Sequence, residues 1–127
     1  MTRWGLVATI KAPRGDVLAF AAWHLEHGAH RLYLYLDEDD PGTLAILKAH
    51  PRIRARHTDD AYWSGKRPRK HQVRQCANAR HANSRKAECD WLAHIDVDEF
   101  LLPATPVEAQ LAALPQSALC APIRPVD

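Results

Sequence analysis

The alternation of short apolar runs with helix-like segments limits the possible fold more than any other feature of this chain. Three apolar runs are rich in β-branched or aromatic residues and are typical of buried strands, at 6–10, 31–36 and 91–95. The segment "RIRARH" alternates with a period of two, which predicts a further strand nearer an edge. Segments with helical spacing lie between these strands, at 17–27, 43–50 and 69–87. This order predicts an α/β fold, a three-layer αβα sandwich with a mostly parallel sheet.

Local signals place the ends of these elements. Asp16 is a suitable N-cap for the helix at 17–27, and Gly28 lies where a glycine commonly ends a helix. Residues 59–68 are expected to form a loop. Beyond the last clear strand, a short helix is expected at 107–114 and a fifth strand at "ALCAPI", residues 118–123.

Composition narrows the class of protein. Apolar residues make up 46% and charged residues 25% of the 127 residues, a balance typical of a globular domain. No stretch approaches the ~18 apolar residues of a membrane span, and the first ten residues lack the pattern of a signal peptide. The three cysteines are odd in number and form no Cys-x-x-Cys pair, which favours reduced thiols. We therefore expect a single cytoplasmic domain without a membrane span.

Charge is unevenly distributed along the chain. Residues 52–90 contain eleven Lys and Arg against four Asp and Glu, whereas residues 91–127 contain one Arg against five acids. A basic middle followed by an acidic end suits an anionic ligand that also needs a metal ion.

The acidic cluster after the apolar run at 91–95 is the strongest chemical signal. In extended backbone Asp96 and Asp98 would face the same way, ~6.6 Å apart from a rise of ~3.3 Å per residue. Their carboxylates could then share a hard cation such as Mg²⁺ or Mn²⁺. The alternative is a solvated turn in which Asp98 or Glu99 acts as a cap, and a second Asp-x-Asp at 37–39 shows how readily such triplets arise.

Several polar segments follow directly after predicted strands. Ligands bind to open α/β sheets beyond the carboxyl ends of the strands, where the strand order reverses. The segments expected at this edge are "KAPRG", "DEDDPG" and "DVDEF".

Taken together and in order, three segments resemble a known family. "AAWHLEHGAHRLYLYLDEDD", "RQCANA" and "WLAHIDVDEFL" are similar to the N-terminal, donor-binding part of glycosyltransferase-family-2-like proteins, over residues 5 to about 102. The resemblance implies the Rossmann-like fold of the A-type nucleotide-diphospho-sugar transferases, as one nucleotide-sugar-binding domain over residues 1–127. It also implies a metal-dependent, hexosyltransferase-like enzyme that uses Mn²⁺ or Mg²⁺ to transfer a sugar from a nucleotide-diphosphate sugar.

The resemblance also implies roles for single residues. Asp96 and Asp98 match the metal-binding Asp-x-Asp motif, with Asp98 as the direct ligand and Asp96 nearer the ribose or the waters on the metal. Glu99 would orient its neighbours. Thr9 and Lys11 match the strand end that lines the nucleoside pocket.

Further donor-binding residues are expected at the second strand and on the helix before the acidic cluster. By resemblance, Asp37 meets the base or the ribose. Arg74, Gln75 and Asn78 are spaced so that they can share one face of the helix at 69–87. The planar guanidinium of Arg74 suits a diphosphate, with Lys70 as a further donor of hydrogen bonds. A solvated helix face remains the alternative, above all for Gln75.

The chain departs from the family in one respect. Family members are considerably longer, and their later half supplies the acceptor contacts and usually the catalytic base. No general base can be assigned here, so the chain is expected to be a truncated transferase or a protein that holds the donor without completing transfer. By family analogy alone, the acceptor would be a cell-surface glycan.

Parts of the sequence are also compatible with other functions. The run "KRPRKHQVRQ" suits a nucleic-acid-binding module, but the formal net charge is only +2 and no aromatic residues are interleaved with it. A non-catalytic nucleotide-binding or interaction domain is a further alternative. A zinc site is another alternative, suggested by His24, His27 and His30, although their spacing is not that of a His-Glu-x-x-His motif.

Overall fold

The computed structural model describes residues 1–85 and 88–126. Its strands are β1 (Trp4–Ile10), β2 (Arg31–Leu36), β3 (Ile53–His57) and β4 (Trp91–His94). Its helices are α1 (Arg14–Glu26), α2 (Pro41–Lys48), α3 (Asp60–Trp63), α4 (His71–Ser84) and α5 (Val107–Ala112). The four strands form one sheet in the order β3-β2-β1-β4, and every pairing is parallel. The α/β class and the parallel sheet are confirmed.

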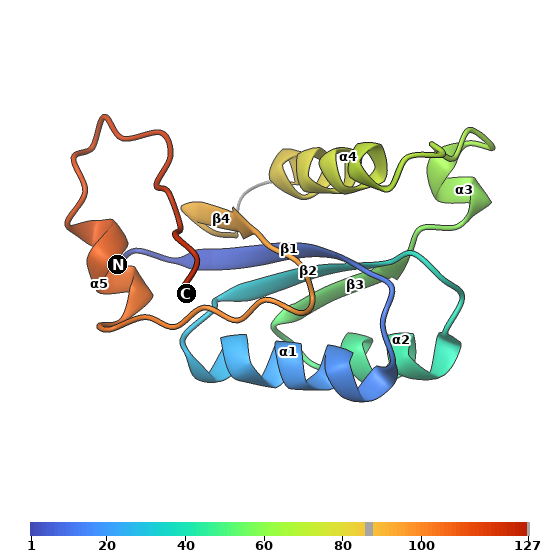
Figure 1. The fold of residues 1–127 in the computed structure, drawn as a ribbon, viewed down its shortest axis with the longest axis horizontal. Coiled ribbons are helices and arrows are strands. Elements are labelled where there is room, and N and C mark those ends of the chain that lie inside the picture. The colour runs from blue at the N-terminus through green and yellow to red at the C-terminus, as the bar shows by residue number, and fades with distance from the viewer. Residues whose placement is uncertain (86–87, 127) are drawn as a thin grey trace.

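Helices cover both faces of the sheet. Helices α1 and α2 lie against one face, and α4 lies across the other, with α3 beyond its N-terminal end (Figure 1). The strands run in the same direction, so their carboxyl ends meet at one edge. In the described part of the chain, no helix is long and apolar enough to cross a membrane.

An apolar core fills the space between the sheet and α1 and α2. Alternate residues of β1 and β2 point into it, since side chains in a strand have a period of two. These are Leu6, Ala8, Ile10, Leu32, Leu34 and Leu36. From the helices, Val17, Phe20 and Leu47 pack onto them and are almost completely buried. This face explains why the two strands were recognisable from their apolar pattern.

Helices α1 and α3 show the clearest departures from the expectation. Helix α1 begins at Arg14 with Pro13 as its N-cap, so Asp16 lies in the first turn rather than at the cap. Proline fits this position because an N–H group at the start of a helix has no partner within the helix, and proline has no N–H. Helix α3 occupies part of the predicted loop, because Asp59 accepts a hydrogen bond from the N–H of Tyr62 and caps a single turn. The end of the helix predicted at 69–87 lies outside the described residues.

The predicted fifth strand at 118–123 is wrong, since this segment forms no strand. Its apolar side chains remain in solvent, with Leu119 95% and Ile123 56% exposed. Pro122 has no N–H to donate to a neighbouring strand. An apolar composition was therefore not sufficient to form a strand here.

Candidate functional site

The strand order creates a switch point at the carboxyl edge of the sheet. The chain passes from β1 outward through β2 to β3 and then crosses to β4, on the other side of β1. The loops after β1 and β4 therefore diverge, which is where open α/β sheets bind ligands. A cleft of about 550 Å³ lies at this point. Of the residues predicted for the site, five line this cleft: Thr9, Lys11, Gln75, Asp96 and Asp98.

The acidic residues after β4 form a tight turn rather than an extended strand end. The N–H of Glu99 donates to the carbonyl oxygen of Asp96 at 3.0 Å. In return, Oε1 of Glu99 accepts from the N–H of Asp96 at 2.8 Å. The predicted extended geometry of Asp96 and Asp98 is therefore wrong, because the Glu99 side chain closes a turn where pairing with β1 ends. Both carboxylates nevertheless line the same cleft. We call residues 96–99 the acidic turn.

The two carboxylates of the acidic turn differ in their contacts. Oδ1 of Asp96 accepts a hydrogen bond from Nε2 of Gln75 at 3.0 Å, which ties the turn to α4. Asp98 is exposed, and it makes no side-chain hydrogen bond or salt bridge within residues 1–85 and 88–126. Asp98 and the second oxygen of Asp96 are therefore available to a ligand.

The carboxylate oxygens of the acidic turn are suitable ligands for a hard divalent cation. Mg²⁺ is commonly held by one or two carboxylates together with phosphate oxygens and waters, rather than by a cage made only of protein. Among the described residues, no three His, Cys, Asp or Glu side chains come together to hold a metal. The turn could thus supply part of a coordination shell that a phosphate ligand completes.

Asn78 connects three elements beneath the cleft. It is fully buried, and its Nδ2 donates to Oγ1 of Thr9 at 2.8 Å. Its Oδ1 accepts from the hydroxyl of Tyr62 at 2.8 Å. Asn78 therefore holds α4 against the end of β1 and does not itself line the cleft.

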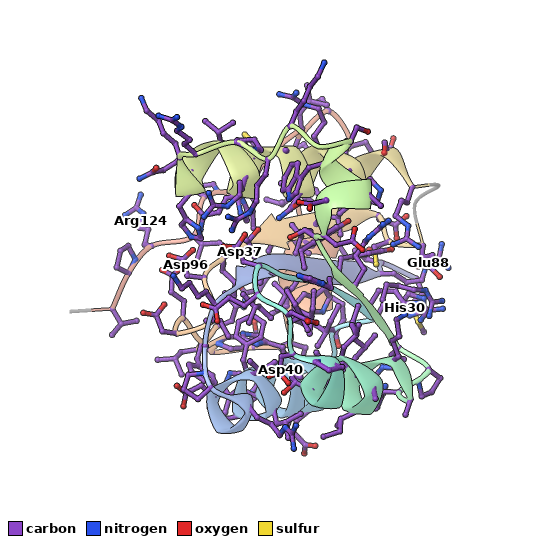
Figure 2. The ribbon with its side chains drawn as sticks, turned by 90° about the vertical axis from the view of Figure 1, so that its right-hand side faces the viewer. His30, Asp37, Asp40, Glu88, Asp96 and Arg124 are labelled. Carbon is purple, nitrogen blue, oxygen red and sulfur yellow. The ribbon has the colours of Figure 1, made fainter. Side chains whose placement is uncertain are left out.

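Asp37 and Arg74 bind each other at the end of β2. Two nitrogens of Arg74 donate to the two carboxylate oxygens of Asp37, at 2.9 Å and 3.1 Å. Arg67 adds a third contact at 3.0 Å. Burial alone would raise the pKa of Asp37, but the hydrogen bonds and charges of the two arginines hold it below its ordinary value. Figure 2 shows Asp37 and Asp96 at the carboxyl edge, which faces the viewer between α4 and the pair of α1 and α2.

Arg74 is also bound to the backbone of the loop before α4. Its Nη1 donates to the carbonyl oxygens of Pro68 and Arg69, at 2.8 Å and 2.9 Å. The guanidinium is thus engaged on both sides and only 8% of the residue is exposed. In this conformation Arg74 organises the loop, and its contact with a diphosphate stays a prediction.

Two helices begin at the cleft, and their N-termini were not among the site features predicted from the sequence. Pro13 and Asp16, from the start of α1, line it, as does His71, the first residue of α4. Helix N-termini carry unpaired N–H groups and a partial positive charge that favours anions. Phe100 adds an apolar wall. The signal for α1 was present in the sequence, since a helix that follows a strand directly must begin at the strand's carboxyl end.

The three histidines near the end of α1 do not assemble a zinc site. His24 is buried, with Nδ1 2.8 Å from the carbonyl oxygen of Phe20 and Nε2 bound by the N–H of Leu101. His27 bonds through Nδ1 to the carbonyl oxygen of Trp23. Both nitrogens of His24 are therefore occupied by the backbone.

Comparison with known proteins gave no match: no family model fits the chain, and neither curated proteins nor solved structures match it. The residues and the geometry of the cleft are what any functional proposal has to rest on.

Proposed function

We propose that this chain is the donor-binding part of a metal-dependent glycosyltransferase and binds a nucleotide-diphosphate sugar in the cleft. One observation carries the proposal. Asp96 and Asp98 line the same cleft as Thr9 and Lys11, at the switch point between β1 and β4. A carboxylate pair thus lies at the switch point, where open α/β sheets bind ligands. The A-type transferase fold is part of this proposal.

In this proposal the acidic turn holds the cation and the surrounding groups hold the diphosphate. Asp98 is the direct ligand, with Asp96 acting through its second oxygen or through a water. A bound Mn²⁺ or Mg²⁺ supplies Lewis-acid stabilisation of the leaving diphosphate. Lys11 is exposed at the end of β1, with its Nζ 3.6 Å from Oε1 of the exposed Glu38, and the N-termini of α1 and α4 add further positive potential.

Charge pairing favours this function over nucleic-acid binding. Arg67 and Arg74 belong to the basic run at 66–75, and both are bound to Asp37. They are therefore less able to bind an extended phosphate backbone.

Calorimetric titration with nucleoside diphosphates and their sugars, with and without Mn²⁺, tests this function. We expect at least one of them to bind only with the metal. The variant Asp98→Asn should lose about tenfold or more in affinity, since changes at residues that only support a metal ligand already cost 10–100-fold.

Asp39→Asn is the matched control, because Asp39 belongs to the chain's other Asp-x-Asp triplet and is exposed. It should leave the affinity unchanged. Failure of every nucleotide to bind beyond the effect of the metal alone would refute the proposal. Binding to single-stranded RNA that falls with salt and survives Asp98→Asn would favour a nucleic-acid-binding module instead.

A further inference from the structure

The segment that follows the acidic turn is fastened to α1 by hydrogen bonds on both sides of one residue. The carbonyl oxygen of Leu101 accepts from Nε1 of Trp23 at 2.8 Å. The N–H of Leu101 donates to Nε2 of His24 at 3.2 Å. Leu101 lies two positions beyond the turn. Its backbone therefore cannot move away from α1 without breaking both bonds.

Phe100 strengthens this connection and carries it into the cleft. Its ring packs edge-on against Trp23 at 5.7 Å and stacks on His24 at 5.8 Å between ring centroids. Phe20 contributes a third aromatic contact at 6.2 Å. Phe100 also lines the cleft next to the acidic turn. A displacement of Leu101 would thus also shift the residues proposed to hold the cation.

The hydrogen bonds fix the protonation state of His24. A backbone N–H can only donate, so Nε2 must be unprotonated, and Nδ1 carries the proton that it donates to the carbonyl oxygen of Phe20. A proton added to Nε2 would face the N–H of Leu101, and the bond would be replaced by repulsion. Only the neutral ring is compatible with this arrangement.

The surroundings of His24 oppose its protonation. Burial lowers the pKa of His24, the hydrogen bond to Phe20 opposes this shift, and the nearby His27 lowers the pKa further. From the facing segment His24 meets the ring of Phe100 and the backbone of Leu101, and the core beside it is apolar. Within the described residues, no carboxylate acts on its pKa.

We propose that Trp23 and His24 form a latch that positions the acidic turn in the cleft, and that protonation of His24 opens this latch. Because the closed form favours the neutral ring, the latch is fully stable above the ordinary histidine pKa of about 6.5 and weakens as the pH falls through the lowered value. Both residues are positioning residues. The consequence for cation binding rests on the proposed function: affinity for Mn²⁺ should fall when the latch opens.

Amide hydrogen exchange measured by NMR between about pH 8 and about pH 5 tests the latch without any metal. After correction for the intrinsic pH dependence of exchange, the amides of Leu101 and Glu99 should lose protection in a single-proton step. The amides of β1 and β2 should stay protected. In His24→Gln the side-chain carbonyl can accept from Leu101 at every pH, so the step should disappear.

Two further variants separate a latch from a general loss of structure. His27→Gln, one turn along α1, should keep the step but move it to a higher pH, because His27 lowers the pKa of His24. Trp23→Phe keeps an aromatic ring against Phe100 but removes the donor to Leu101, so protection of Leu101 should fall at every pH. This second variant tests the latch even if His24→Gln does not fold.

A parallel Mn²⁺ titration distinguishes the latch from the proposed function. In the wild type, affinity should fall about fivefold or more across the step, a typical coupling between two sites, and His24→Gln should abolish the fall. If Mn²⁺ does not bind at all but the Leu101 step follows His24, the latch stands and the proposed function fails. The latch is overturned if the step persists in His24→Gln, if it vanishes instead in His71→Gln, or if Trp23→Phe leaves Leu101 protected.

Discussion

The two faces of the sheet are held by different forces. On the face covered by α1 and α2, buried aliphatic and aromatic side chains make up almost all of the contact. On the face covered by α4, a small apolar cluster is accompanied by buried polar residues, including Arg74 and Asn78. The predicted site residues that belong to a helix are Arg74, Gln75 and Asn78, and all three lie on α4, which covers this second face. The apolar face thus supplies most of the core, and the polar face ties the strand ends at the site to α4 through hydrogen bonds.

The polar face has a second cluster, at the end of the sheet away from the cleft. Glu88 binds Arg54 through both carboxylate oxygens, Arg31 at 3.1 Å and the hydroxyl of Tyr33 at 2.9 Å. The hydrogen bonds from Arg54, acting against burial and helped by those from Tyr33 and Arg31, lower the pKa of Glu88 to about 2. Glu88 thereby joins β2 and β3 to the segment before β4. Figure 2 labels it well away from Asp37 and Asp96.

The largest effect is expected on the apolar face. Leu34 is completely buried, so Leu34→Ala should lower the free energy of unfolding by about 2–5 kcal/mol, from lost burial and an unfilled cavity. Because no charge is involved, urea denaturation should give the same loss at neutral and at mildly acidic pH. Ile46→Ala is the control, since Ile46 is 45% exposed on α2. Equal losses in the two variants would contradict the account of this face.

On the polar face, Arg74→Met should cost about 2–4 kcal/mol near neutral pH, because among the described residues it leaves the buried Asp37 with Arg67 as its only charged partner. The pKa of Asp37 is lowered in the folded state, so the pair stabilises above the ordinary carboxyl pKa and loses this effect as the pH falls through the lowered value. The cost measured by urea denaturation should therefore shrink in acid. Arg80→Met, at an exposed position of α4, should cost little at any pH, and a cost for Arg74→Met that is independent of pH would argue against the ion pair.

The cluster at Glu88 should show a smaller effect with the same sign. Its carboxylate is partly exposed, so solvent screens the pair, and Glu88→Gln should cost about 1–2 kcal/mol near neutral pH. The pKa is lowered from 4.5 to about 2, so this cost should be complete above pH 4.5 and should disappear as the pH falls toward 2. Chemical denaturation of both proteins across this range measures the difference. A difference that grows in acid would show that Glu88 is not held as a carboxylate.

The smallest effect concerns the hydrogen bond beneath the cleft. Tyr62→Phe removes the donor to Oδ1 of the buried Asn78 and should cost about 1 kcal/mol. Thermal unfolding measures this cost. Asn78 keeps its bond to Thr9, so the cleft should persist, and binding of the nucleotide-diphosphate sugar should weaken less than in Asp98→Asn. A loss of binding as large as that of Asp98→Asn would show that Tyr62 takes part in ligand binding itself.

The contrast between the faces also explains what could be predicted from the sequence. The apolar runs at 6–10 and 31–36 were sufficient to place β1 and β2. The spacing of Arg74 and Asn78 predicted that both share one face of α4, and in the structure that face is buried. Their partners were not predictable, because Thr9 lies in β1 and Asp37 directly after β2, and only the tertiary structure brings them to α4.

Two errors have a similar origin. The acidic turn was expected to be extended, since nothing local showed that the Glu99 side chain would bind the N–H of Asp96. The segment 118–123 was expected to be a strand because it is apolar, but apolar residues form a strand only where a sheet edge accepts them. In both places the outcome depended on which hydrogen-bond partners were within reach.

Paramagnetic broadening by Mn²⁺ of the protein's amide NMR signals, recorded with a nucleoside diphosphate present, tests the central claim most directly. The account predicts that the signals of Lys11, Gln75 and Asp98 broaden first, while those of Arg31 and Glu88 at the opposite end of the sheet stay sharp. Broadening centred on Asp39, or spread evenly over the molecule, would show that the acidic turn does not hold the cation.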